Sequence, residues 1–194
     1  MSGDGELDRA FVFHAPTLTN AGMMVRVDIN DLLADAFGRL PGLVRGAVAG
    51  LDAEQLRRPP APGANTVGWL VWHLTRIQDD HVADLIGDDQ IWVTGPWAPR
   101  FELNPDPADT GYAHGPDEVL GVRPASGKVL VDYYMAVHER TAALIRAVSP
   151  EDLDRIVDKS WNPPVTMGVR LVSVLNDDVQ HVGQAAYVRG IILR

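Results

Sequence analysis

Four stretches of the chain carry apolar residues at intervals of three and four, which is the spacing of an amphipathic helix. Pro41 falls inside the first stretch, so we expect a break near residues 38–40. Residues 161–167 contain two prolines and predict an extended or hairpin-like crossing. The predicted helices cover residues 28–50, 66–86, 129–148 and 169–193. This pattern predicts an all-α fold, a four-helix bundle with at least one long crossover.

The crossover is predicted between the second and third helices. Residues 87–127 contain six prolines and six glycines in 41 residues, too many for a regular element of any length. A loop this long lets the second and third helices run parallel. Its aromatic side chains would be wasteful in a disordered linker, so we expect part of the loop to pack over the bundle as a lid. These aromatic residues are Trp92, Trp97, Phe101 and Tyr112.

Composition predicts one domain, residues 28–194, preceded by an N-terminal tail or extension, residues 1–27. His14 lies in that tail, and we expect it to be unrelated to any site. No apolar run approaches the roughly 18 residues of a membrane span, and no secretory signal is visible. We therefore expect a cytoplasmic protein with no membrane partner. The formal charge of −9 argues against nucleic-acid binding.

The chain has no cysteine, so a metal ion would have to be held by His, Asp, Glu or backbone. Asp177 and His181 are four residues apart and lie on the apolar stripe of the fourth helix, so both can point inward to one place. A third ligand must come from a facing helix. His73 is the best candidate, because it lies on the predicted inner stripe of the second helix. That stripe comprises Leu70, His73, Leu74, Ile77, His81 and Leu85, and we expect Arg76, Gln78, Asp79 and Asp84 to face solvent.

Two histidines and one carboxylate with a vacant position are the composition of a catalytic zinc site, which also suits nickel, iron or other divalent ions. A hydrogen-bonded core histidine and a surface Asp–His pair are the structural alternatives. Asp178 would replace Asp177 if the helix were rotated. His81 and Gln184 are candidates for orienting the ligands or the substrate, whereas His138 and His114 are expected to lie elsewhere.

Two motifs resemble the DinB-like superfamily. They are N-T-V-G-W-L-V-W-H-L at residues 65–74 and D-x-x-x-H-x-G-Q-x-x-Y-x-R-G at residues 177–190. Within the superfamily, the chain looks most similar to the DUF664 and mycothiol-dependent maleylpyruvate isomerase branches. The resemblance implies an up-down-down-up bundle with zinc or nickel held by His73, Asp177 and His181. Asp177 stands where many members have His and the isomerase branch has Glu.

The resemblance also implies thiol transfer with a small-molecule thiol and an electrophile as partners. The composition is typical of a high-GC actinobacterium and favours mycothiol as the thiol cosubstrate. Our first hypothesis is a metal-dependent thiol S-transferase or isomerase, with a homodimer as a further expectation. The alternatives are a non-enzymatic, metal-stabilised bundle, such as a stress-associated binding protein or a dimer, and a metal-dependent hydrolase that uses a bound water.

Overall fold

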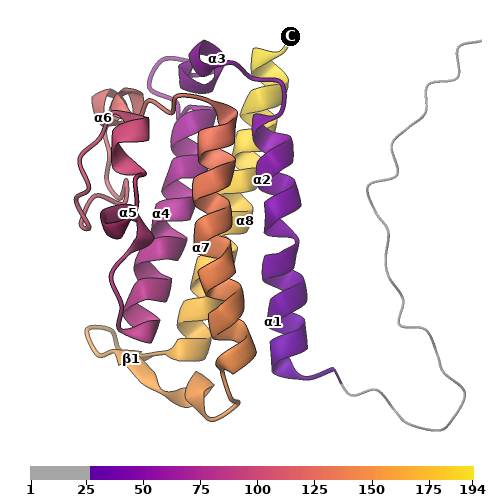
Figure 1. Ribbon diagram of the computed structural model, residues 1–194, viewed down its shortest axis with the longest axis vertical. Helices are drawn as coiled ribbons and strands as arrows, with labels where there is room; N and C mark the ends of the chain where they lie inside the picture. The colour runs from indigo at the N-terminus through magenta and orange to yellow at the C-terminus, as the bar shows by residue number, and fades with distance from the viewer. Residues whose placement is uncertain (1–26) are drawn as a thin grey trace, which may run out of the picture.

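The computed structural model describes residues 27–194, so residues 1–26 of the predicted extension, His14 among them, lie outside the described residues. Its long helices are α1 (Ile29–Gly38), α2 (Leu40–Val48), α4 (Val67–Ile86), α7 (Gly127–Ala147) and α8 (Met167–Ile192). In Figure 1, α1 and α2 rise together, α4 and α7 descend, and α8 rises again to the C-terminus. The predicted all-α, up-down-down-up bundle is therefore confirmed.

Local sequence signals set the ends of these helices. Asp28 accepts a hydrogen bond from the Asp31 amide at 2.8 Å and starts α1, and Thr66 accepts one from the Trp69 amide at 3.0 Å and starts α4. The expected break occurs at Arg39, because Pro41 can occupy the first turn of a new helix but not the interior of an old one. Gly87, with φ of 70°, ends α4 in the left-handed conformation.

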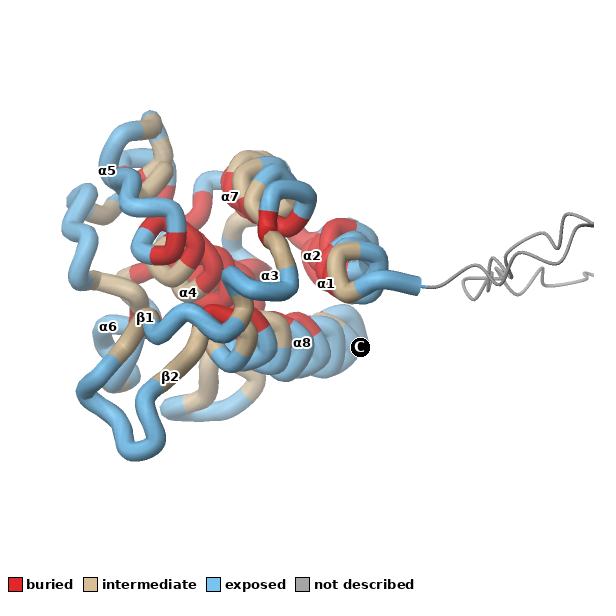
Figure 2. The backbone as a smooth tube through the Cα atoms, turned by 90° about the horizontal axis from the view of Figure 1, so that it is seen from below, coloured by how far each residue is buried: buried red, intermediate tan, exposed pale blue. Residues whose placement is uncertain are grey.

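The core lies where the four long segments face one another. Helix α4 packs against α7 and α8, and α2 packs against the same two helices from the other side. Figure 2, viewed along the bundle, shows the buried residues of these helices turned toward a common centre. The apolar stripe predicted for the fourth helix is buried in α8, through Val174, Ala185, Val188 and Ile192. None of the helices within residues 27–194 combines the length and apolar character that a membrane crossing needs.

Short elements connect the long ones. Helix α3 (Ala53–Arg57) joins α2 to α4, and the turn η2 (Asp152–Asp154) follows α7. Strands β1 (Ile156–Asp158) and β2 (Val165–Thr166) pair antiparallel with an irregular register, so the predicted hairpin is present but its strands flank residues 161–164.

The connection from α4 to α7 contains α5 (Ile91–Thr94), η1 (Ala98–Phe101) and α6 (Pro116–Gly121), and it returns along α4 to the other end of the bundle (Figure 1). Trp92 and Phe101 are fully buried and Trp97 is half-buried, so most of the predicted packing is present. Tyr112 was expected to pack as well, but it is 87% exposed.

This connection also overturns the predicted solvent face of α4. Asp84 is exposed as expected, but Arg76, Gln78 and Asp79 each have 0% exposure. The loop covers Arg76 and Asp79, and α7 covers Gln78, whose side-chain amide donates to the Thr141 hydroxyl at 2.7 Å. Helix α4 is therefore buried over most of its circumference, because the loop covers the side that α7 and α8 leave open.

Candidate metal centre

Helices α4 and α8 bring His73, Asp177 and His181 to one place. Each residue offers a ligand atom, and the three ligand atoms lie within 4.8 Å of one another. The two helices run antiparallel and pack closely along their length, so His73 meets residues 104 and 108 positions further along the chain. Asp177 and His181 share a side of α8 because they are one turn apart. The structure thus assembles the three residues that the sequence pattern selected.

His73 is held from two sides. Its Nδ1 lies 2.6 Å from the Thr110 carbonyl oxygen, so Nδ1 carries the proton and Nε2 keeps the lone pair. The indole of Trp69, one turn earlier on α4, stacks on the imidazole with ring centres 4.6 Å apart and an interplanar angle of 10°. Burial lowers the pKa of His73, with the Thr110 carbonyl opposing that effect. A neutral, oriented imidazole is the form that binds a metal ion.

The α8 pair forms the more exposed side of the cluster. Nε2 of His181 lies 3.4 Å from an Asp177 carboxylate oxygen, and the two side chains are 19% and 30% exposed. Nδ1 of His181 donates to the Gln184 side-chain oxygen at 3.0 Å. Asp177, through that contact with the imidazole, raises the pKa of His181. Gln184 therefore orients His181 in the way Thr110 orients His73, and both leave Nε2 toward the cluster.

The donor set fits a divalent ion. The 3.4 Å between His181 Nε2 and Asp177 Oδ1 matches one edge of a tetrahedral zinc site, roughly 3.4 Å for bonds of about 2.0–2.2 Å. The second oxygen of Asp177 is buried and has no hydrogen-bond partner, which an anionic oxygen rarely tolerates. The rings of His73 and His181 meet edge to face, with their centres 4.7 Å apart. A cation bound by all three would satisfy each open lone pair.

Residues from the long loop complete one wall of the cluster, and sequence reasoning missed them. Nδ1 of His114 accepts from the Trp69 indole at 3.2 Å, and its Nε2 donates to Asp109 at 3.0 Å. Its ring also stacks on Trp72 at 5.7 Å. Thr110 contributes only a carbonyl, which every residue has. The one sequence feature that pointed to this contact was Gly111, because a glycine allows a positive φ and a close approach of the backbone. Gly111 has φ of 87° and lies against His73 and Trp72.

Other predicted candidates lie outside this cluster. Asp178 is fully buried on the core side of α8, with no hydrogen-bond partner for either oxygen. Burial raises the pKa of Asp178 well above its usual range. Among residues 27–194, Asp177 and not Asp178 therefore belongs to the candidate metal-binding cluster.

Two further histidines occupy separate environments. His81 lies two turns beyond His73 on α4, where its Nδ1 accepts from Arg170 at 2.7 Å. Burial lowers the pKa of His81, and the Arg170 charge lowers it further. His138 lies half-buried on α7, stacked on Tyr134 at 6.0 Å. A role for His81 in orienting substrate stays a prediction.

The fold and the cluster define a four-helix-bundle protein with a candidate divalent-metal centre between α4 and α8. The chain belongs to the DinB superfamily, whose family model matches residues 36–185. Members of this superfamily commonly bind divalent metals.

Comparison with solved structures adds a similar bundle. It is the crystal structure of the conserved protein of locus from Enterococcus faecalis, with a TM-score of 0.80 and 31% sequence identity. The similarity covers 87% of this chain and 99% of that chain. A search of curated proteins gave no match.

Proposed function

We propose that this protein is a metal-dependent thiol S-transferase or isomerase, with zinc or nickel held by His73, Asp177 and His181. The observation that carries the proposal is the convergence of three ligand atoms within 4.8 Å, with Asp177 and His181 partly open to solvent. Three protein ligands leave a position for an exogenous molecule, as in catalytic zinc sites.

The thiol would come from outside the protein, since the chain has no cysteine. A divalent ion, when bound, supplies Lewis acidity that lowers the pKa of a coordinated thiol and favours the nucleophilic thiolate. The thiol sulfur then forms a C–S bond with the electrophile while its proton leaves to solvent. In a transfer the leaving group departs with the electron pair of its bond, and in an isomerisation the thiol is later eliminated unchanged. Mycothiol is the cosubstrate that we propose.

This chain's residues contribute orientation and exclusion of water. Thr110 and Gln184 fix the two imidazoles, and Trp69 covers one face of His73. The cluster is thereby buried on the α4 side and accessible on the α8 side. An electrophile would approach over α8, where Gln184 is exposed and can contact it.

Elemental analysis combined with a conjugation assay tests the proposal. Protein purified without chelator should carry about one divalent ion per chain, and His73→Ala and His181→Ala should lose it. His138→Ala is the matched control, because it removes a half-buried imidazole that does not join the cluster. The wild type should conjugate mycothiol to a model electrophile, and chelation should abolish this.

Three results would contradict the proposal. The first is a folded wild type that retains no metal and binds none on titration. The second is metal binding that raises the melting temperature without any thiol conjugation, which would support the non-enzymatic bundle. The third is metal-dependent cleavage of esters or amides without a thiol, which would support the hydrolase.

A further inference from the structure

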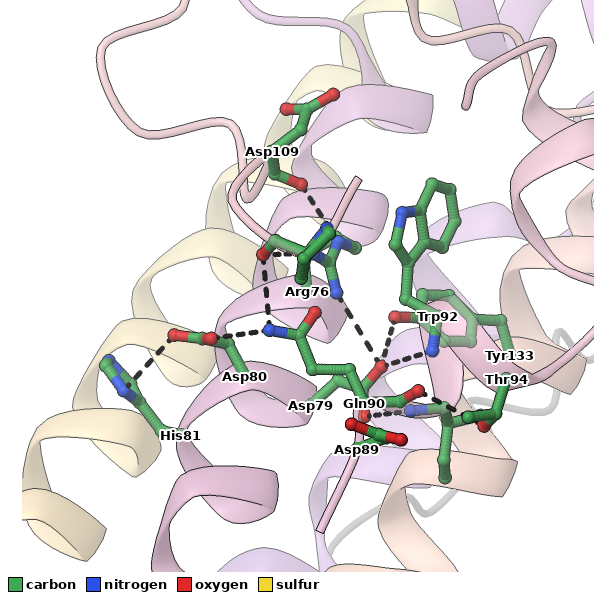
Figure 3. Close-up of polar contacts among 12 residues, drawn as sticks. Arg76, Asp79, Asp80, His81, Asp89, Gln90, Trp92, Thr94, Asp109 and Tyr133 are labelled. Carbon is green, nitrogen blue, oxygen red and sulfur yellow. Dashed lines mark hydrogen bonds and ion pairs between the residues drawn. The ribbon is translucent and has the colours of Figure 1, made fainter. Parts of the chain in front are cut away.

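A fully buried arginine holds the loop that covers His73. The Arg76 guanidinium donates from Nε to the Asp109 carbonyl at 3.0 Å, and from Nη2 to the carbonyls of Pro107 and Asp106 at 3.1 and 3.4 Å. Figure 3 shows this side chain between the Asp109 carbonyl and Asp79. The rigid, planar guanidinium presents several donors at once, so it fixes the path of the backbone over residues 106–109.

Asp79 ties a second part of the same connection to the same turn of α4. One oxygen accepts from the Ile91 amide at 2.9 Å, and the other accepts from the Trp92 amide at 2.7 Å and the Tyr133 hydroxyl at 2.8 Å. Nη1 of Arg76 lies 3.7 Å from this carboxylate, and neither side chain has any exposed surface. The guanidinium also lies over the Trp92 ring, 5.0 Å from its centre.

The loop fixed in this way delivers the next carbonyl to the candidate metal ligand. Thr110 follows Asp109 directly, and its carbonyl oxygen lies 2.6 Å from Nδ1 of His73. His73 and Arg76 are three residues apart on α4, so they share one face of the helix and one segment of loop covers both. Neither anchor residue touches the ligand atoms themselves. The shortest route from this pair to the ligand atoms runs through Thr110 and His73.

We propose that the buried Arg76–Asp79 pair is a positioning device for the metal ligand His73. The pair fixes residues 106–110, so that the Thr110 carbonyl keeps the proton on Nδ1 and leaves the Nε2 lone pair for the cation. The relevance to metal binding rests on the proposed function, whereas the tautomer is a property of the metal-free chain. Outer carbonyl and carboxylate partners of ligand histidines change metal affinity by about 10–100-fold when they are lost.

Arg76→Lys is the test variant, because it keeps a charge beside Asp79 but cannot reach three carbonyls. Thr141→Val is the matched control, since it removes a buried hydrogen bond between α4 and α7 that has no contact with the loop. Two measurements are made on each protein. Long-range ¹H–¹⁵N spectra of the metal-free protein, assigned with His73→Gln, report the His73 tautomer. Competition with a chromophoric chelator gives the Zn²⁺ dissociation constant.

The wild type and Thr141→Val should show the Nδ1–H tautomer of His73 and equal Zn²⁺ affinity. Arg76→Lys should populate the other tautomer and bind Zn²⁺ about 10–100-fold more weakly. If Arg76→Lys keeps the wild-type tautomer and an affinity within about twofold, or if Thr141→Val loses as much affinity, the positioning role is overturned.

If Arg76→Lys does not fold, a second variant allows the same test. Arg76→Met combined with Asp79→Leu removes both buried charges together, which proteins tolerate better than breaking one partner. The same two readouts then decide. A wild type that binds no Zn²⁺ would refute the proposed function, but the His73 tautomer would still decide the positioning role.

Discussion

Gly111 lies directly against His73, and replacing it with alanine should lift the loop away from the candidate metal centre. The residue has φ of 87°, a conformation that L-residues rarely adopt. A Cβ atom there would lie 2.8 Å from Nδ1 of His73 and 2.8 Å from the Trp72 ring, both closer than van der Waals contact. The side chains below it are stacked and buried, so the loop and not the imidazole has to move.

The expected loss of stability has two parts. Holding alanine in the left-handed region costs roughly 1–2 kcal/mol. Moving the loop also breaks the hydrogen bond between His73 and the Thr110 carbonyl, which contributes about 0.5–1.5 kcal/mol, or more if the carbonyl stays buried without a partner. Gly111→Ala should therefore lower the free energy of unfolding by about 2–4 kcal/mol.

Urea unfolding of the metal-free protein, followed by tryptophan fluorescence in the presence of a chelator, measures this loss. With a typical urea dependence of about 2 kcal/mol per molar, the midpoint should fall by about 1–2 M. Gly115→Ala is the control in the same loop. Gly115 has φ of −80°, and an added Cβ would find its nearest neighbour, a Glu118 oxygen, at 3.6 Å, so its effect should stay within about 1 kcal/mol. Equal midpoints for the two variants would refute the close approach of Gly111 to His73.

Three further predictions concern buried groups away from the cluster. Asp178→Val removes two buried oxygens that have no hydrogen-bond partner, so calorimetry should show a stabilisation of about 1–3 kcal/mol at neutral pH. Burial lowers the pKa of His138, so the folded state binds its proton less tightly than the unfolded chain does. The contribution of His138 to the free energy of unfolding is therefore fully present above about pH 6.5 and is lost as the pH falls toward the folded pKa. Compared with His138→Phe, the wild type should lose at most about 1.4 kcal/mol per pH unit in this range. Parallel pH profiles of the two proteins would contradict this prediction. Trp92→Ala empties a fully buried site between α4 and α7, and should cost about 3–5 kcal/mol and expose residues 88–115 to limited proteolysis.

The long helices could be predicted from the sequence because each one carries apolar residues at intervals of three and four. Pro41 marked the break between α1 and α2, and the predicted first residues of two helices, 28 and 66, are the N-caps of α1 and α4. These signals are local, so no knowledge of the partner helices was needed. The assignment of polar residues to the solvent was less secure, because polarity alone does not say what covers a residue.

Arg76 and Asp79 show why that part of the prediction was wrong. The sequence pattern placed both residues on the solvent-facing side of α4, but the loop covers them completely. Irregular segments carry no hydrophobic period, so their path cannot be read from the pattern.

The candidate site was predictable to the extent that side-chain chemistry defines it. His73, Asp177 and His181 were selected by residue type and helical spacing, and the structure brings them together. The carbonyl of Thr110 could not be predicted, because backbone groups leave no mark in the sequence. Gln184 was selected as a residue that could orient a ligand or the substrate. In the structure its side-chain oxygen accepts a hydrogen bond from Nδ1 of His181.

The crossover between α4 and α7 also bears on how this bundle could diversify or be redesigned. The contacts that hold the crossover over His73 come mainly from one helix, through Trp69, Trp72, Arg76 and Asp79 of α4. If residues 88–126 were grafted onto another bundle, they would lack the α4 side chains that hold them in place. The transferable unit is α4 together with the crossover, a contiguous segment that carries one candidate metal ligand and the loop that covers it. Recombining this segment with different α8 helices would change the other candidate ligands.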